Sequence, residues 1–188
     1  YGQIRPRDFR PTPSAAQQLQ ELKWQDAGPE YLLVDGYNII FAWEELKEIA
    51  KTDLESARAA LIDLMANYQN FKQCVLILVF DAYKVPGGRE RVYQHRGIYV
   101  VFTKEAETAD NYIEKTTFQI GEKHRVRVAT SDYLEQIITL GHGALRVSAR
   151  TFHEEVAHTS GEIRRIIEEN NWKNRHFGQI DLSKTKRR

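Results

Sequence analysis

Four aspartates occupy matching positions along the chain, each close behind an apolar segment. Asp35, Asp81 and Asp132 stand at the ends of three predicted strands, and Asp110 lies just inside the helix that follows a fourth. In an open parallel sheet, ligand sites lie outside the carboxyl ends of the strands. We therefore expect all four carboxylates to face the same edge of one sheet.

Carboxylates packed this closely have a chemical consequence. They repel one another and raise each other's pKa unless a cation neutralises them. Hard oxygen ligands suit Mg²⁺ or Mn²⁺. Two such ions about 4 Å apart can clamp a phosphodiester, activate water and stabilise the leaving oxygen. The pattern predicts a Mg²⁺ or Mn²⁺ site in which the four aspartates are metal ligands and catalytic residues, and it leaves open whether one ion binds or two.

Each aspartate taken alone also has a structural interpretation. An Asp-Gly pair after a strand is commonly a turn, and an aspartate near a helix start is commonly a cap. Only the shared placement of the four favours a metal site. The candidate supporting residues are Asn38, which can orient Asp35, and Thr130 and Ser131, which can hydrogen-bond Asp132 or a phosphate. All three are residue types that are equally ordinary in caps and turns.

A basic stretch with two adjacent glycines lies beside Asp81. Its candidate RNA-binding residues are Lys84, Arg89, Arg91 and Arg96. A loop of this composition can follow a phosphate backbone. A solvated surface loop explains the same residues equally well.

The elements that must position these residues alternate between apolar runs and amphipathic stretches. Strands are predicted at 31–34, 75–80, 98–102, 126–129 and 145–147, and helices at 53–72, 108–123, from 132 to about 140, and 151–171. Thr52 with Glu55, and Thr151 with Glu154, have capping-box spacing. Alternating strands and helices imply crossover connections, and the run VLILVF suits a strand covered on both faces. We expect an α/β fold: a three-layer α/β/α sandwich with a mainly parallel central sheet.

The chain divides into three predicted regions. Residues 1–29 form a linker and a short helix, because three of the five prolines fall within the first 13 residues. Residues 30–172 form the domain that carries the aspartates. Residues 173–188 form a basic C-terminal tail.

Composition excludes several classes of protein. The formal net charge of +1 gives no global sign of nucleic acid binding. The single cysteine excludes an intrachain disulfide and a cysteine-rich zinc site. The chain has no secretory signal pattern and no apolar run near the ~18 residues that span a membrane, so we expect a cytoplasmic protein with no membrane partner. It also lacks the motifs of P-loop NTPases, dinucleotide-binding folds and α/β-hydrolases.

Four sequence blocks around the aspartates carry a family resemblance. They are VDGYNII at 34–40, VFDA at 79–82, VFTKEAETAD at 101–110 and ATSD at 129–132, followed by a structural block, GALRVSAR, at 143–150. In order and spacing they resemble the NYN domains, a bacterial branch of the PIN-like nucleases, and in particular the YacP-like subgroup. The resemblance runs from residue 31 to about 171. It departs mildly at Ala82, where the family often has glycine.

This resemblance implies a PIN-like fold and a divalent-metal endoribonuclease. The family's metal residues carry over to Asp35, Asp81, Asp110 and Asp132, with Asn38 in support. The subgroup includes a ribosome-associated endonuclease that cuts mRNA during translation, so the implied partners are RNA, in particular mRNA, and the ribosome. The start at Tyr1 suggests a fragment of a longer protein. The resemblance of the nuclease domain implies that this is the C-terminal part of a protein in which the domain follows a translation GTPase similar to the tetracycline-resistance ribosomal protection factors, with residues 1–13 as the end of the GTPase and the linker.

Two other functions compete with this expectation. A non-catalytic RNA- or ribosome-binding module could retain the same carboxylates, although all four acidic positions are intact. A DNA nuclease of the flap type would need additional helical elements, for which the chain has no room. The sequence leaves the oligomeric state open.

Overall fold

The computed structural model describes residues 28–82, 91–131 and 144–180. Its centre is a six-stranded sheet with the strand order β3-β4-β2-β1-β5-β6. All neighbouring strands are parallel except β3 and β4, which form an antiparallel pair. The strands are β1 (Tyr31–Asp35), β2 (Val75–Phe80), β3 (Arg91–His95), β4 (Ile98–Phe102), β5 (Val126–Thr130) and β6 (Leu145–Ser148).

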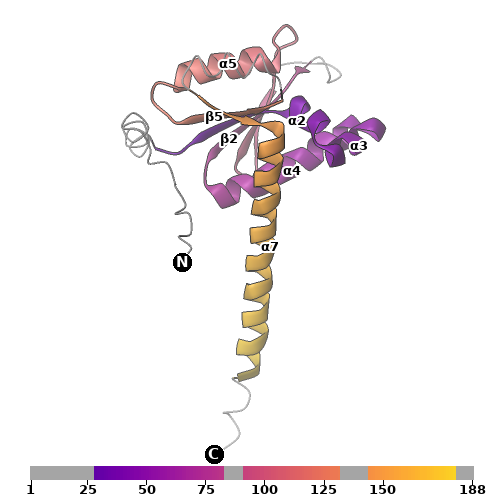
Figure 1. The fold of residues 1–188 in the computed structure, drawn as a ribbon, viewed down its shortest axis with the longest axis vertical. Helices are drawn as coiled ribbons and strands as arrows, with labels where there is room; N and C mark the ends of the chain where they lie inside the picture. The colour runs from indigo at the N-terminus through magenta and orange to yellow at the C-terminus, as the bar shows by residue number, and fades with distance from the viewer. Residues whose placement is uncertain (1–27, 83–90, 132–143, 181–188) are drawn as a thin grey trace, which may run out of the picture.

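Helices cover both faces of this sheet (Figure 1). On one face lie α2 (Gly36–Ala42), α3 (Glu44–Thr52), α4 (Leu54–Lys72) and the start of α7 (Ala149–Ile180), and on the other lies α5 (Ala109–Ile120). Within β1, Leu32 and Val34 belong to one buried cluster and Leu33 to the other, which is why apolar residues run without interruption along the strand. The predicted α/β/α sandwich with a mainly parallel sheet is confirmed.

Several local predictions are wrong. Residues 91–95, expected within a basic loop, form the edge strand β3, which returns to β4 through a tight turn with positive φ at Arg96 and Gly97. The α4 helix is capped by Asp53, whose carboxylate accepts from Glu55 N and Ser56 N, and not by Thr52. The α7 helix starts earlier than predicted, because Ser148 Oγ accepts from Thr151 N.

The α7 helix is much longer than the sequence suggests. It continues to Ile180, beyond the predicted end at 171, and projects away from the sandwich (Figure 1). Its outer part exposes apolar side chains, including Ile166, Ile167 and Trp172. The division of the chain at 172 stays a prediction, as does the short helix within 1–29, most of which lies outside the described residues. None of the helices in the described ranges is both long enough and apolar enough to cross a membrane.

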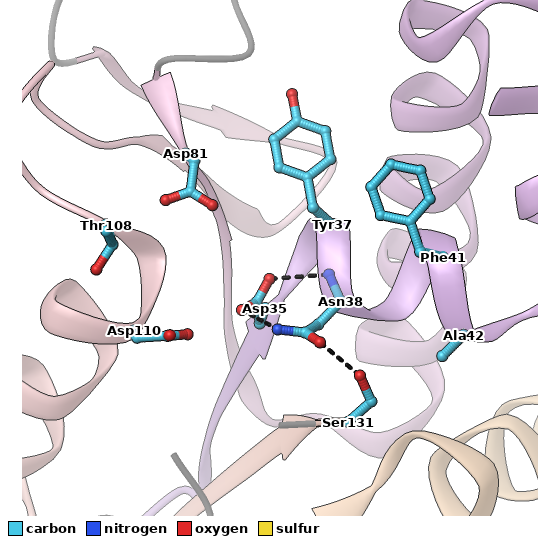
Figure 2. Close-up of a pocket in the computed structure, with 9 residues that line it drawn as sticks. All are labelled: Asp35, Tyr37, Asn38, Phe41, Ala42, Asp81, Thr108, Asp110 and Ser131. Atoms are coloured by element: carbon cyan, nitrogen blue, oxygen red, sulfur yellow. Dashed lines mark hydrogen bonds between the residues drawn. The ribbon is translucent and has the colours of Figure 1, made fainter. Parts of the chain in front are cut away.

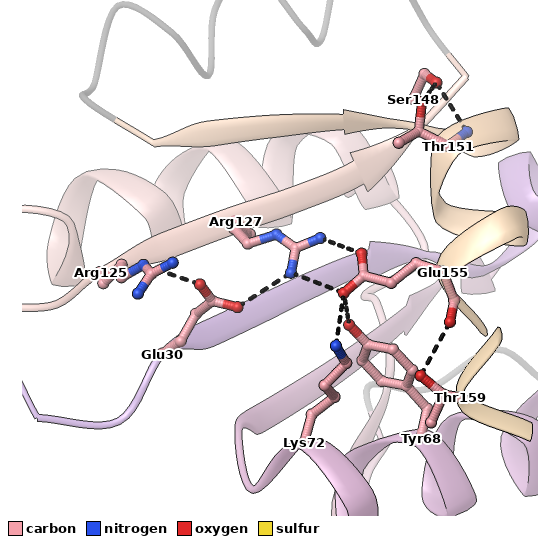
Figure 3. A network of polar contacts seen from close by, with 9 residues as sticks. All are labelled: Glu30, Tyr68, Lys72, Arg125, Arg127, Ser148, Thr151, Glu155 and Thr159. Carbon is pink, nitrogen blue, oxygen red and sulfur yellow. Dashed lines mark hydrogen bonds and ion pairs between the residues drawn. The ribbon is translucent and has the colours of Figure 1, made fainter. Parts of the chain in front are cut away.

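A polar network ties the sheet to α4 and α7 near the amino ends of β1 and β5 (Figure 3). Arg127 of β5 donates to Glu155 of α7 at 2.7 Å and to Glu30, just before β1, at 3.2 Å. Tyr68 of α4 also donates to Glu155, at 2.7 Å, and Lys72 lies 3.4 Å from it. Burial opposes ionisation of Glu155, but hydrogen bonds from Arg127 and Tyr68 outweigh it and lower the pKa of Glu155 to about 2.

Candidate active site

An open cleft of about 560 Å³ lies at the carboxyl ends of the central strands (Figure 2). This is the edge at which parallel sheets commonly bind ligands. Three of the four predicted aspartates line it. The described lining residues are Asp35, Tyr37, Asn38, Phe41, Ala42, Asp81, Thr108, Asp110 and Ser131.

Asp35 is held firmly at the base of the cleft. It ends β1, is only 3% exposed, and serves as the N-cap of α2. Its two carboxylate oxygens accept from Asn38, one from the backbone N at 3.0 Å and the other from Nδ2 at 2.7 Å. Ser131, just after β5, donates to Asn38 Oδ1. This chain of hydrogen bonds fixes the orientation of Asp35, as expected for Asn38. A hydrogen bond from Ser131 to Asp132 or to a phosphate stays a prediction.

Asp81 is positioned by the start of α5. Its Oδ1 accepts from the backbone N of Ala109 at 2.7 Å, so the end of β2 is joined to the first turn of the helix. Thr108 is the N-cap of α5 and accepts from Asn111 N at 3.2 Å. The next residue but one, Asp110, therefore lies in the first turn and lines the cleft beside Asp81.

Close packing between α2 and β2 lies directly beside the cleft. Gly36 lies against the ring of Phe80, and a Cβ at this position would overlap the ring. Gly36 follows Asp35 in the chain, and Phe80 precedes Asp81. Glycine at 36 therefore allows α2 to approach the end of β2 closely beside two aspartates of the cleft.

The charge of the cleft is one-sided. Three of its described lining residues are acidic and none is basic. In Figure 2 the carboxylates of Asp81 and Asp110 point toward the space in front of Asp35. Their oxygens are the donors that Mg²⁺ and Mn²⁺ prefer, so the donor chemistry fits a hard divalent cation. Within the described ranges, however, no three acidic, histidine or cysteine side chains come close enough to hold one ion together.

The remaining predicted site residues are divided between described and undescribed parts of the chain. Asp132, Lys84 and Arg89 lie outside the described residues. Thr130 is buried at the end of β5 and is not among the residues that line the cleft.

The structure separates the two described arginines of the basic stretch. Arg91 begins β3 opposite Phe102, at the same edge as the aspartates, and its guanidinium lies 4.9 Å from the centre of the Tyr93 ring. Arg96 lies at the other edge, where it contacts Asp63 and Asn67 of α4. Arg96 is thus remote from the cleft.

Two aromatic residues of the cleft differ in their exposure. Tyr37 is buried and packs edge-on against Phe80, as a core residue does. Phe41 is 46% exposed and lines the cleft, so its ring is accessible to a ligand. The helical spacing from Asn38 to Phe41 is the sequence signal that places both on the same side of α2. Thr108 was not predicted, although its position before Ala109-Asp110 marks it as a helix cap.

The sequence is similar to those of known proteins. The sequence model of the YacP-like NYN domain matches residues 32–188. The chain belongs to this family. The YacP-like NYN domain has a curated relative, the uncharacterized protein YacP of Bacillus subtilis (strain 168), which is 45% identical over 139 residues, covering 73% of this chain and 81% of the relative.

Two crystal structures from Bacillus subtilis resemble this YacP-like NYN domain. One is Rae1 (YacP), with a TM-score of 0.68 and 43% identity over 81% of this chain and 87% of that one. The other is a tryptophan-to-leucine mutant of Rae1 (YacP), with a TM-score of 0.65 and 42% identity over 75% and 82% of the two chains. Membership of the NYN family indicates a nuclease-type, RNA-related role.

Proposed function

We propose that this YacP-like NYN domain is a divalent-metal-dependent endoribonuclease that hydrolyses RNA phosphodiester bonds at the acidic cleft. The observation that carries the proposal is the convergence of Asp35, Asp81 and Asp110, from three separate elements, on one cleft whose described lining contains no basic residue. Family membership supports the same chemistry. A phosphodiester is an anion, so a cleft of this charge can accept it only with a cation present.

Each residue of the cleft has a separate proposed role in this reaction. Asp35, Asp81 and Asp110 are proposed ligands of Mg²⁺ or Mn²⁺, with Asp132 as a further one; among the described residues no more than two of them come close enough to share one ion. When bound, such a cation supplies positive charge at the phosphodiester and lowers the pKa of the attacking water. Asn38 keeps Asp35 oriented through its two hydrogen bonds. Phe41 offers an exposed ring on which a base can stack.

The setting of this activity is a further part of the proposal. We propose mRNA as the substrate, the ribosome as a partner, and the cytoplasm as the location. The implied fusion to a translation GTPase stays a prediction, since residues 1–13 lie outside the described residues. Lys84, Arg89 and Arg91 stay candidate RNA-binding residues, and Arg96 is left out because it lies at the opposite edge of the sheet.

Cleavage of single-stranded RNA with added Mn²⁺ tests the proposal, and Asp81→Asn is the sharpest variant. Asparagine keeps the oxygen that accepts from Ala109 N, so the end of β2 and the start of α5 should stay joined. We expect the cleavage rate to fall by about 100-fold or more, since even neighbours of metal ligands commonly contribute 10–100-fold. Asp63→Asn is the matched control, because Asp63 is exposed on α4 and contacts Arg96 and His95 away from the cleft.

Two results would contradict the proposal. One is equal cleavage by wild type, Asp81→Asn and Asp63→Asn. The other is tight binding of RNA or ribosomes by a wild-type chain that cuts no RNA with any divalent metal. The second result would favour a non-catalytic binding module, a function that fits the absence of a three-ligand group among the described residues.

A further inference from the structure

A second hollow, of about 740 Å³, adjoins the acidic cleft. The two share Ala42 and Ser131, so they lie side by side near the end of β5. We call this hollow the β6–α7 groove. Unlike that of the cleft, its lining includes basic side chains, Arg146, Arg150 and His153, together with Glu44 and Glu45.

The two arginines are available to an external anion. Arg146 is exposed on β6, and within the described part of the chain no ion pair or hydrogen bond of its side chain is found. The side chain of Arg150 is 90% exposed, and its Nε lies 3.3 Å from Glu154 one turn along α7. An exposed pair of this kind contributes little stability, so a phosphate can replace it at small cost.

The acidic residues of the groove are already engaged. His153 Nε2 lies 3.1 Å from Glu45, and Glu44 lies 3.5 Å from Lys47. Ser148 and the first turn of α7 complete the groove wall, and the start of a helix favours negative charge. The groove therefore offers two exposed arginines beside glutamates that already have partners, whereas the described lining of the cleft has three aspartates and no basic residue.

The groove is also rigidly built. Trp43, at the junction of α2 and α3, is buried, and its Nε1 donates to the carbonyl of Ala149 at 2.8 Å. Its ring contacts those of Phe152 and His153 in α7. The start of α7 is thereby fixed to the helix that carries Asn38. A ligand in the groove would meet preformed walls, which reduces the entropy lost on binding.

We propose that the β6–α7 groove binds the phosphate backbone of the RNA strand on one side of the cleaved bond, with Arg146 and Arg150 contacting phosphates. This inference rests on the proposed function of the cleft. Three carboxylates repel a polyanion, so affinity for RNA must come from positive charge outside the cleft. The groove supplies it on a surface continuous with the cleft.

Binding of a short fluorescent single-stranded RNA tests the proposal by anisotropy at several salt concentrations. EDTA is present so that binding is measured without metal-dependent cleavage. The variant Arg146→Gln/Arg150→Gln removes both groove charges. The matched control, Arg164→Gln/Lys173→Gln, removes two exposed charges from the projecting part of α7.

We expect the groove variant to bind RNA about 10-fold more weakly at low salt and to lower the slope of log K against log salt by about 1.4, or ~0.7 for each lost contact to a single strand. The control should match wild type. Arg146→Lys/Arg150→Lys should restore the slope, because lysine also contacts phosphate as a point charge. Melting curves of all variants verify that they fold.

Three results would overturn the inference: wild-type affinity in the groove variant, an equal loss in both double variants, or no RNA binding by wild type. A different set of results is expected if the groove binds RNA but the cleft is not a nuclease site. In that case wild type binds RNA through the groove, as the groove variant reveals, but cuts nothing when Mn²⁺ is restored.

Discussion

Acidic side chains near the two ends of the sheet lie in opposite electrostatic settings. At the carboxyl end, Asp35 accepts two hydrogen bonds from the neutral side chain and backbone of Asn38. Toward the amino end, Glu155 is bound by Arg127 and lies close to Lys72. The charge of Glu155 is neutralised within the fold, whereas the hydrogen bonds of Asp35 orient it without supplying a cation.

The difference separates a structural cluster from a candidate functional one. A carboxylate paired with arginine holds elements together, as Glu155 joins α7 to β5 and α4. Carboxylates gathered in one cleft repel each other, and their oxygens are the ligands that a divalent cation prefers. Functional sites commonly retain such a cost in stability.

The largest expected change in stability comes from removing the cation of the structural cluster. Arg127→Met leaves Glu155 partly buried without its main partner, and we expect the free energy of unfolding to fall by about 3 kcal/mol. Urea unfolding measures this. The double variant Arg127→Met/Glu155→Met removes both charges and should regain most of the loss. If the single variant is as stable as wild type, the cluster is not what holds α7 to the sheet.

Beside the cleft, close packing should contribute more to the stability of the fold than the charges of the cleft do. Gly36→Ala inserts a methyl group against Phe80, so we expect a loss of about 1–3 kcal/mol from overpacking. Because Gly36 and Phe80 adjoin Asp35 and Asp81 in the chain, a shift of either should displace a carboxylate of the cleft, so the cleavage rate should fall as well. Gly161→Ala is the matched control, since a Cβ there meets nothing within 4 Å. Equal stability and cleavage in both variants would show that the Gly36 contact is not needed.

Lowering the pH should also remove the contribution of Glu155 to stability. The folded-state pKa of Glu155 is about 2, below its ordinary value of 4.5, so its contribution is present above pH 4.5 and is lost as the pH falls toward 2. Thermal melting should show wild type and Glu155→Gln converging over this window. A constant difference between them from pH 6 down to about 2 would contradict the assigned pKa shift.

Much of the sheet was predictable because buried parallel strands leave a simple signal. The runs at 75–80 and 98–102 are apolar throughout, and each precedes a part of the cleft. The edge strand β3 was missed because it is half exposed, and its polar residues resemble a loop. The helices α2 and α3 were not predicted, and the break between them lies at Trp43, which binds Ala149, 106 residues away.

The sequence predicted which aspartates lie together at the candidate site, but it did not predict how the charged residues around them are placed. Repeated placement after strands identified Asp35, Asp81 and Asp110, because strand polarity alone brings such positions together. Arg91 and Arg96 lie apart because the strand β3 extends between them, and this strand was not predicted. The partnership of Arg127 with Glu155 joins residues 28 apart, and its only signal was a charged residue within a buried strand.

Locating Mn²⁺ by anomalous scattering in crystals of this chain tests the central claim most directly. We predict a peak in the acidic cleft, in direct contact with the carboxylate of Asp81 and with that of Asp35 or Asp110. The same crystals of Asp81→Asn should show a weaker peak or none. A wild-type cleft without a peak at saturating Mn²⁺ would contradict the assignment of these aspartates as metal ligands.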